Sequence, residues 1–200
     1  MNITIEQPHH AAAIDNLLDL SFGPNRAGKT VYRLRDGVDP VPGLSLVALE
    51  DDAVVGTIRY WPILIGGETP SILLGPIAVA PGLRSDGLGA RIIRQSLNRA
   101  SAAGWRSVIL VGDAPYYSRF GFTRDLTLNM SLPGPVDLDR FLGLELVPGS
   151  LQGVSGMIAR WPSEPVPGIA ADLAARQLSV GTGVGTGAFA PDGWALNAPA

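Results

Sequence analysis

A β-strand that leads through a glycine-containing loop into an amphipathic helix constrains this chain more than any other feature. The strand spans residues 71–80, and the helix at 87–103 carries apolar residues on one side and arginines on the other. The run SVILV at 107–111 follows the helix and is typical of a strand that is buried on both faces. Because a strand–helix–strand crossover joins parallel strands, this unit predicts two neighbouring parallel strands with a helix packed across them.

The strands before this unit are joined by short turns and are therefore expected to pair antiparallel. Turn residues at 50–52 and at Gly66-Gly67 separate three strand-like runs, which is the pattern of consecutive hairpins. The fold class is therefore α/β in the broad sense (α+β), with a mixed, mostly antiparallel central sheet that is flanked by helices and contains one parallel, splayed strand pair. The expected strands are 2–6, 44–50, 54–61, 71–80, 107–111, 122–132, 141–147 and 153–161, and the expected helices are 9–22, 29–36, 87–103, 114–120 and 169–178.

The dipeptide Gly75-Pro76 interrupts the middle of the strand at 71–80. Proline cannot donate to a sheet ladder, so the dipeptide predicts either an edge strand or a bulge. A bulge would splay this strand from its neighbour and leave backbone groups unpaired. A linear amide ligand could then pair with Ile77 to Val79 as an added strand does.

Composition narrows the function classes. Lys and Arg number 15 against 18 Asp and Glu, a net charge of −3, so the chain lacks the basic footprint of a nucleic-acid-binding protein. It has no cysteine, which excludes a thiol nucleophile and a Cys-based metal site, and its 2 histidines are adjacent. No apolar run approaches the roughly 18 residues that span a membrane, and no signal peptide is visible. We expect a cytoplasmic protein with no metal, no nucleic acid and no membrane among its partners.

The loop at 84–90 (RSDGLGA) opens a helix directly after a strand. The first amides of a helix have no partner within it and carry partial positive charge, and glycine lets a phosphate approach them closely. The dinucleotide fingerprint needs a third glycine where Ile92 stands, and the ATP- or GTP-binding loop needs a Gly-Lys-Ser/Thr run that is absent. Two interpretations remain: a site for the diphosphate of an acyl carrier, or an ordinary helix start with packing glycines.

Two motifs carry a resemblance to a known family. The run 79–90 (VAPGLRSDGLGA) resembles motif A of the GNAT acyl-CoA N-acyltransferases, whose pattern is Arg/Gln-x-x-Gly-x-Gly/Ala. The run 116–122 (YYSRFGF) resembles the Tyr-x-x-x-Gly-Phe segment of the same superfamily, and one helix and one strand separate the two motifs. The context at 112–117 (GDAPYY) is similar to the YhbS-like bacterial branch. The resemblance covers residues 1–150 and is strongest over 71–122.

This resemblance implies an N-acetyltransferase that uses acetyl-CoA as its co-substrate and lets the acceptor amine attack the thioester directly. The pantetheine amides would pair with the backbone of Ile77 and Val79, and the diphosphate would lie on the N–H groups of residues 84–90. Tyr117, four residues before Gly121, matches the family's general acid for the CoA thiolate, and Tyr116 matches a packing aromatic. The implied CoA-binding residues are Ile77, Ala78, Val79, Arg84, Ser85, Asp86, Gly87, Leu88, Gly89 and Ala90.

Ser85 and Asp86 depart from the family pattern, which often has Gly followed by Arg or Lys at these positions. Asp86 places a negative charge beside the expected diphosphate, which would weaken binding of the carrier. Alternatively, its side chain caps the helix, a common use of Asp before a helix.

The acceptor side has no readable motif, and the resemblance implies only a small-molecule or protein amine. A chain of waters is as good a general base as any side chain. The candidates, each with a purely structural alternative, are Glu50, Asp113, His9 and His10 as the base, Tyr60 and Trp61 as pocket walls, and Arg59 as the receptor for an anionic acceptor.

A rival hypothesis is a catalytically silent acyl-CoA-binding module that acts as a sensor or a partner subunit, since no general base stands out. The expected organisation is a GNAT acyltransferase domain over residues 1–162 and a Gly-rich C-terminal appendage of unassigned role over 163–200. A homodimer is an open alternative to a monomer, with the appendage as the segment that could dock on a second subunit.

Overall fold

A twisted mixed sheet organises the part of the chain that the computed structural model describes, residues 1–28, 30–84 and 86–162. The strands run in the order β1-β2-β3-β4-β5-β7, while β8 pairs with the far end of β3 and with the short strand β6. Along the main order every pair is antiparallel except β4 with β5, as the sequence predicted. The strands are β1 (Asn2–Ile5), β2 (Leu46–Glu50), β3 (Ala53–Ile65), β4 (Thr69–Val79), β5 (Ser107–Val111), β6 (Met130–Ser131), β7 (Phe141–Glu145) and β8 (Gly156–Arg160).

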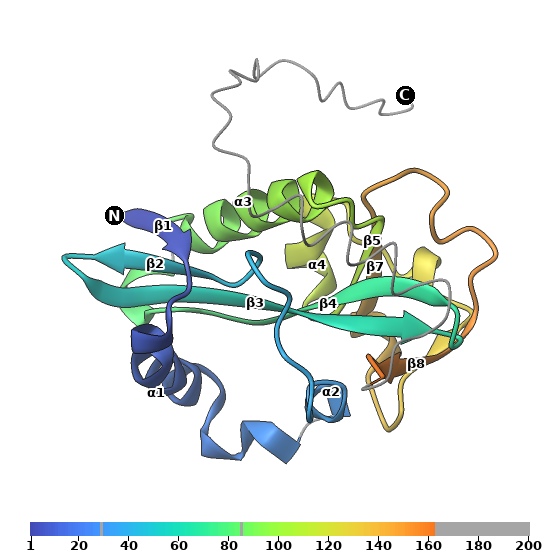
Figure 1. Ribbon diagram of the computed structural model, residues 1–200, viewed down its shortest axis with the longest axis horizontal. Helices are drawn as coiled ribbons and strands as arrows, with labels where there is room; N and C mark the ends of the chain where they lie inside the picture. Colours follow the sequence, from blue (N-terminus) through green and yellow to red (C-terminus); the bar gives the residue numbers. More distant parts are fainter. Residues whose placement is uncertain (29, 85, 163–200) are drawn as a thin grey trace.

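Helices cover both faces of the sheet. Figure 1 shows α1 and α2 below the sheet and α3 and α4 above it. The helices are α1 (Ala11–Phe22), α2 (Thr30–Arg33), α3 (Leu88–Ala102) and α4 (Ala114–Tyr117), and the 3-10 turns are Pro8–His10, Pro24–Gly28, Pro81–Leu83, Ser118–Phe120, Asp125–Thr127 and Leu138–Arg140. No helix within the described ranges has the length and apolar character needed to cross a lipid bilayer.

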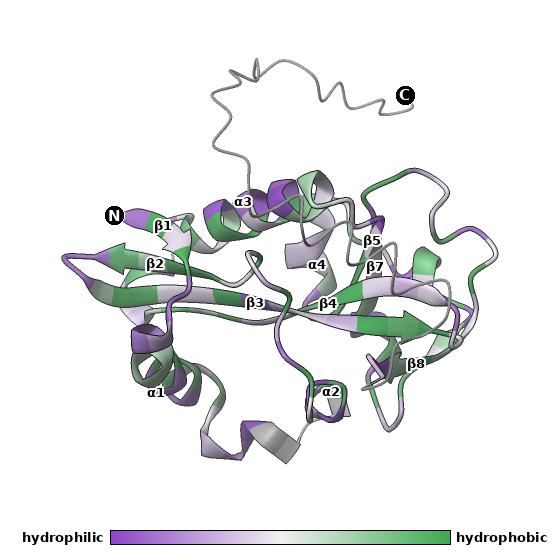
Figure 2. Cartoon of the chain, viewed as in Figure 1, coloured by the Kyte–Doolittle hydropathy of each residue, from purple (hydrophilic) through white to green (hydrophobic). Residues whose placement is uncertain are grey.

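The two faces of the sheet have separate apolar cores. The long helix α3 buries the side predicted from its 3.6-residue periodicity, and its polar side faces outward (Figure 2). Each aliphatic side chain that is fully buried in this way contributes about 1.5–3 kcal/mol. On the opposite face, Ile14 and Leu18 of α1 pack against Val47 and Ala78. The residues of α3 that face the sheet are Leu88, Ile92, Ile93, Leu97 and Ala100.

The prediction of a strand at 122–132 is wrong. Only Met130–Ser131 is a strand, and the preceding residues form a 3-10 turn at Asp125–Thr127. Thr127 explains the difference, because its buried Oγ1 donates to the carbonyl of Phe141 at 2.6 Å and fixes the turn against β7. Side chains of Ser and Thr compete with sheet ladders in this way, and an alternation of polar and apolar residues does not reveal it. The helix predicted at 169–178 lies outside the described residues.

Candidate active site

β4 and β5 separate soon after they meet. Their parallel pairing is limited to Ile72 with Val108 and Leu73 with Ile109. Beyond Leu73, β4 stays paired with β3, but its register shifts between the pairs Tyr60–Leu74 and Ile58–Ile77. This confirms the bulge predicted at Gly75-Pro76, and it leaves one edge of β4 without a neighbouring strand.

The bulge is held by an indole. Trp61 Nε1 donates a hydrogen bond of 2.7 Å to the carbonyl of Gly75. Trp61 is half-buried in β3 and is not one of the residues that line the cavity described below. Its role in the fold is therefore to shape β4 next to the opening.

The backbone of Ile77 and Val79 faces the opening. The amide of Ala80 donates to the Val55 carbonyl of β3 at 2.8 Å. Because successive residues of a strand point their polar groups to opposite sides, Ala78 also faces β3, and Ile77 and Val79 face away from it. Arg84 supports this orientation, since its Nε donates to the Val79 carbonyl at 3.2 Å. The sequence expectation placed the pantetheine amides on Ile77 and Val79 and counted Ala78 as a binding residue as well, whereas in the structure Ala78 points its backbone groups at the neighbouring strand.

The first turn of α3 presents free amides at the same end of β4. Its N-cap is Gly87, in the left-handed region at φ 72°, and the first helical bond runs from the amide of Arg91 to the carbonyl of Gly87. The amides of residues 88–90 have no hydrogen-bond partner among the described residues. A helix that begins in this way offers its first N–H groups to an anion.

The remaining residues of the glycine loop differ in what they can offer. Asp86 is exposed and stands before the N-cap, so it does not cap α3 as one interpretation had it. The guanidinium of Arg84 is turned toward Val79 and toward Ser21, whose Oγ accepts from Nη2 at 3.4 Å. Ser85 lies outside the described residues.

Gly89 brings the first turn of α3 close to Tyr116 of α4. A Cβ atom built on Gly89 would lie 3.0 Å from the hydroxyl oxygen of Tyr116 and 3.6 Å from Cγ2 of Val79. A side chain at position 89 would therefore crowd Tyr116 beside the free amides.

Tyr117 is fixed next to this opening by the short helix α4. Asp113 caps α4, because its carboxylate accepts from the amide of Tyr116 at 3.1 Å. The ring of Tyr117 lies on Gly112, where a built Cβ would come within 2.2 Å of Cε2, and packs edge-on against Phe122 with 5.8 Å between ring centroids. The side chain is buried, but its hydroxyl has no partner among the described residues and is not sealed from solvent. That hydroxyl consequently faces the cavity.

The environment of Tyr117 keeps its phenol protonated. Burial raises the pKa of Tyr117 to about 12, the neighbouring Tyr116 and Asp113 add to this increase, and Arg140 opposes it. A neutral phenol at the edge of a cavity is able to donate a proton at physiological pH.

A cavity of about 490 Å³ fills the opening between β4 and β5. Its floor is the bulge and the end of β5, one wall comes from residues 22–35, and the other wall from residues 135–140. Tyr60 and Trp61, expected as pocket walls, do not line it. The lining residues are Phe22, Thr30, Val31, Tyr32, Arg35, Leu74, Gly75, Pro76, Ile77, Val111, Gly112, Asp113, Tyr116, Tyr117, Pro135, Val136, Asp137 and Arg140.

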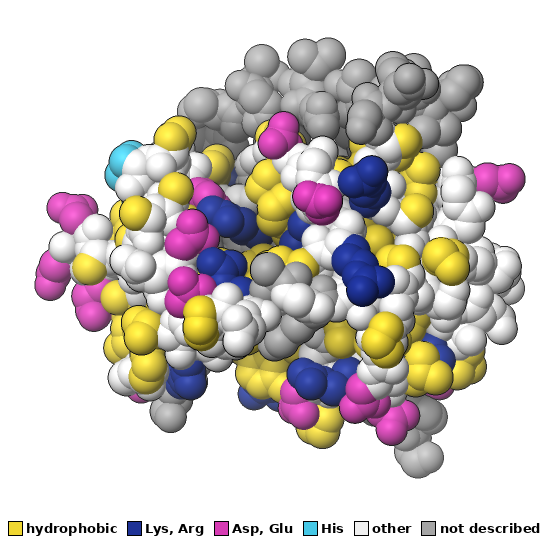
Figure 3. All heavy atoms as spheres, turned by 90° about the horizontal axis from the view of Figure 1, so that it is seen from below, with side chains coloured by type: hydrophobic (Ala, Val, Ile, Leu, Met, Phe, Trp, Pro, Cys, Tyr) yellow, Lys and Arg dark blue, Asp and Glu magenta, His cyan; other side chains and the backbone are white. Residues whose placement is uncertain are grey.

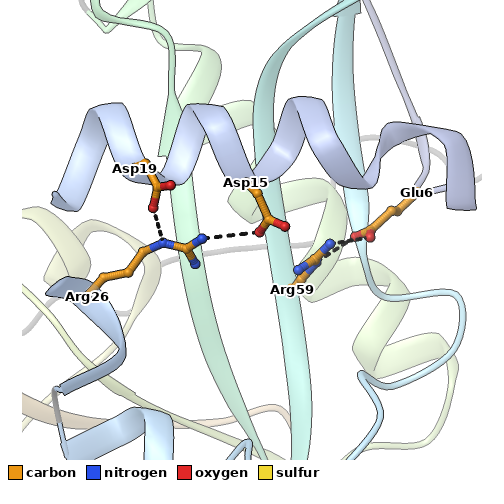
Figure 4. A network of polar contacts seen from close by, with 5 residues as sticks. All are labelled: Glu6, Asp15, Asp19, Arg26 and Arg59. Carbon is orange, nitrogen blue, oxygen red and sulfur yellow. Dashed lines mark hydrogen bonds and ion pairs between the residues drawn. The ribbon is translucent and has the colours of Figure 1, made fainter. Parts of the chain in front are cut away.

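Several side chains proposed for the acceptor side are occupied elsewhere. Arg59 forms a two-point ion pair with Glu6, with Nε to Oε2 at 2.8 Å (Figure 4). Tyr60 is fully buried, and its hydroxyl bonds Ser96 Oγ at 2.8 Å in the core. His10 accepts from the Gln7 amide through Nδ1 at 3.0 Å, at the start of α1.

The cavity lining separates the candidates for the general base. Of the candidates, Asp113 lines the cavity, whereas Glu50, His9 and His10 do not. Asp137, which the sequence did not single out, lines it as well. Among the described residues, no group of three or more His, Cys, Asp and Glu side chains is arranged to hold a metal ion.

Comparison with known proteins identifies the family. A family model described as an acetyltransferase (GNAT) domain matches residues 42–124. The uncharacterized N-acetyltransferase YhbS of Escherichia coli is 31% identical over 160 residues, which are 79% of this chain and 95% of that protein. This chain belongs to the GNAT acetyltransferase family.

Solved structures of GNAT proteins agree with this assignment. A crystal structure of Escherichia coli YhbS in complex with CoA has a TM-score of 0.69 and 30% identity, and the match covers 80% of this chain and 89% of that one. A GNAT family acetyltransferase from Brucella melitensis, in complex with acetyl-CoA, has a TM-score of 0.57 and 33% identity over 74% of this chain and 88% of its own. The GNAT fold and family predicted from the two motifs are therefore confirmed.

Proposed function

We propose that this chain is an N-acetyltransferase that moves an acetyl group from acetyl-CoA to a primary amine. One observation carries the proposal: Tyr117 lines the cavity where β4 and β5 part, and the first turn of α3, with its unpartnered amides, lies beside Tyr116 of the same cavity lining. Support also comes from two relatives, one of which was solved with CoA and the other with acetyl-CoA.

The donor is bound mainly by backbone. The pantetheine amides pair with the backbone groups of Ile77 and Val79 that point away from β3, as an added strand would. The diphosphate lies on the amides of residues 88–90, where the partial charge of the helix terminus favours an anion. Gly87 supplies the turn, Gly89 the clearance, and Arg84 a guanidinium in the same loop.

The acetyl group is transferred by direct attack of the amine nitrogen on the thioester carbonyl. The C–N bond forms, the C–S bond breaks, and the CoA thiolate takes up a proton from Tyr117 Oη. A phenol and a thiol differ by about 1.5 pKa units in water, which corresponds to about 2 kcal/mol. The cavity that raises the pKa of Tyr117 to about 12 also disfavours a thiolate, so burial acts on both partners in the same direction.

The acceptor must reach the thioester as a free amine. For an amine with a lysine-like pKa near 10.4, deprotonation at pH 7 costs about 4.6 kcal/mol, or about 3.4 units at 1.36 kcal/mol each. Asp113 and Asp137 at the cavity wall, directly or through water, are the bases that the geometry favours.

Replacement of the phenol tests the assignment of Tyr117. With saturating acetyl-CoA and a panel of amines, we expect Tyr117→Phe to lower kcat for thiol release about 10²- to 10⁴-fold, with CoA affinity retained. Tyr60→Phe is the matched control, because it removes the same atom from the core behind the cavity. Unchanged kcat in Tyr117→Phe would rule out the proton-donor role.

The rival function is a silent acyl-CoA-binding module. It is favoured by the capping bonds that already engage both cavity carboxylates, Asp113 with the Tyr116 amide and Asp137 with the Asp139 amide, each at 3.1 Å. Calorimetric binding of CoA together with no thiol release on any amine would support this alternative.

The proposed acyltransferase domain spans residues 1–162, and residues 163–200 form an appendage without an assigned role. The 160-residue match to YhbS, which covers 95% of that protein, supports a domain of about this size. Expression of residues 1–162 alone, followed by the thiol-release assay, tests the boundary.

A further inference from the structure

Arg35 brings an unpaired positive charge to the cavity. It follows α2 in the chain and lines the cavity beside the bulge, where a Cβ built on Gly75 would lie 3.3 Å from its Nη2. The ring of Tyr32 lies 4.4 Å from the guanidinium carbon and that of Trp61 lies 5.9 Å from it. These aromatic contacts hold the plane of the guanidinium in place and leave its edge to make hydrogen bonds.

The hydrogen-bonding groups of Arg35 are only partly satisfied. Nε and Nη1 are sealed from solvent without a hydrogen bond, and Nη2 is not among the sealed atoms. Burial lowers the pKa of Arg35 to about 10, the charge and a hydrogen bond of Tyr32 oppose this shift, and Arg26 and Arg59 add to it. A charge that is largely removed from water normally has a counterion or a full set of hydrogen bonds, whereas this half-buried guanidinium has no carboxylate and only Tyr32 as a hydrogen-bond partner among the described residues.

The neighbouring arginines do have counterions. Arg26 bonds Asp19 at 2.7 Å and Asp15 at 3.2 Å, and Arg59 pairs with Glu6 (Figure 4). Carboxylates on α1 and after β1 are thus used to neutralise two guanidinium groups on this side of the sheet. On the face of the molecule where α1 and α2 lie, arginine side chains gather around a hollow with hydrophobic atoms inside it (Figure 3). The described residues supply no carboxylate to Arg35.

We propose that Arg35 receives a carboxylate of the acceptor, so that the substrate is a small amine that also carries a carboxylate, of the amino-acid class. This inference rests on the proposed acetyl transfer and adds the acceptor's chemistry. A carboxylate accepting from Nη2 would supply the missing counterion in a charge-assisted hydrogen bond. Pairing of this kind is strong in a water-poor cavity, where the guanidinium has already lost its hydration.

The position of Arg35 also limits the length of the acceptor. Nη2 lies 3.3 Å from the place of a Cβ built on Gly75, in the same cavity that Tyr117, the proposed proton donor to the thiolate, lines. A carboxylate on Nη2 therefore keeps its amine within reach of the carbonyl only if few bonds separate them. The other lining side chains near the bulge, Val31, Leu74 and Val136, are apolar, which favours an α-amino acid with an apolar side chain.

The test compares acceptors that differ only in the anion. Leucine, leucinamide and 3-methylbutylamine are assayed with wild type, Arg35→Met and Arg35→Lys. Arg35→Met keeps the length and the packing on Tyr32 and Trp61, and it removes an unpaired buried charge, so we expect it to fold. Arg106→Gln is the control, because this exposed arginine stands before the opposite end of β5.

We expect wild type to prefer leucine to both neutral amines, and Arg35→Met to reduce kcat/KM for leucine about 10- to 100-fold, mainly through KM. The neutral amines should be unaffected, Arg35→Lys should restore part of the activity, and Arg106→Gln should behave as wild type. In the series glycine, β-alanine, 4-aminobutyrate and 6-aminohexanoate, activity should fall with spacing. Equal loss of kcat on all acceptors would overturn the proposal and place Arg35 on the thioester instead.

Binding separates this inference from the failure of catalysis. The affinity of the CoA-loaded protein for N-acetylleucine and for N-acetylleucinamide is measured by calorimetry in wild type and Arg35→Met. A preference for the carboxylate that disappears in Arg35→Met supports the site even if no amine is turned over, in which case only the acetyl transfer fails. Equal affinity for both compounds in wild type would overturn the site while leaving acetyl transfer to other amines intact.

Discussion

Gly112→Ala moves the ring of Tyr117 without changing its chemistry. The added Cβ would lie 2.2 Å from Cε2 and 2.7 Å from Cδ2 of Tyr117, and 3.1 Å from Cδ1 of Leu110. An ordinary contact starts near 3.4 Å, so the ring must shift by at least about 1.2 Å or the backbone must move away. Overpacking of this kind costs about 1–3 kcal/mol of unfolding free energy.

The same shift should reduce turnover. A displacement of about 1 Å at a catalytic group costs about 10²-fold in rate, so we expect kcat to fall by about that factor with CoA affinity retained. The assay combines thiol release, calorimetry with CoA and thermal unfolding. Gly28→Ala is the matched control, since a Cβ there meets nothing within 4 Å and its φ is not positive.

A double variant decides whether the effect acts through the phenol. If it does, Gly112→Ala should cause little further loss of kcat in a Tyr117→Phe background, because the displaced hydroxyl is already gone. Independent, multiplying losses would mean that the methyl group acts by filling the cavity. A Gly112→Ala protein that is destabilised but turns over normally would refute the link between the position of this ring and the chemistry.

Two further predictions concern the donor site and the phenol. Gly89→Ala should weaken CoA binding about 10-fold, measured by calorimetry, because the added methyl group would crowd Tyr116 beside the free amides. The stability of the protein should not fall, since Ala is the better helix former. An unchanged affinity for CoA would contradict the diphosphate site. The pKa of Tyr117 is about 12 in the folded protein and about 10 in the unfolded chain, so the folded state keeps the phenol proton to higher pH. The unfolding free energy should therefore fall by on the order of 2 kcal/mol as the pH rises from 10 toward 12. Urea titrations at several pH values should show this fall reduced in Tyr117→Phe, and an identical fall in both proteins would contradict the burial of the phenol.

The donor half of the site was accessible from the sequence because backbone geometry builds it. Gly75-Pro76 predicted the bulge from the missing N–H of proline, and the glycines at 87 and 89 predicted a helix start open to an anion. These signals are local, so a single sequence shows them. The resemblance also named Ile77 and Val79 as the backbone that would pair with pantetheine, and in the structure the orientation of these two residues follows from the pairing of β4 with β3.

Errors in the predicted elements have a similar origin in long-range contacts. The residues before β6 alternate as a strand does, yet Thr127 bonds the carbonyl of Phe141 and makes a turn. Gly143 permits this, since a Cβ there would lie 3.1 Å from both Leu126 and Thr127. Neither partner is a sequence neighbour of the turn, and local propensity therefore gave the wrong answer.

The acceptor half of the proposed site, unlike the donor half, is not built from local backbone geometry. It is made of side chains that converge from residues 22–35 and 135–140, and no spacing rule connects these segments. Arg59 was a candidate for receiving an anionic acceptor, but the fold provides it with Glu6. Arg35 had no distinguishing pattern, and it became the candidate only when the structure showed that Arg26 and Arg59 have carboxylate partners, whereas Arg35 lines the cavity with two sealed, unbonded nitrogens and no carboxylate. Since a largely desolvated guanidinium without a counterion is unfavourable in the free protein, a ligand that brings the negative charge to the cavity would stabilise it.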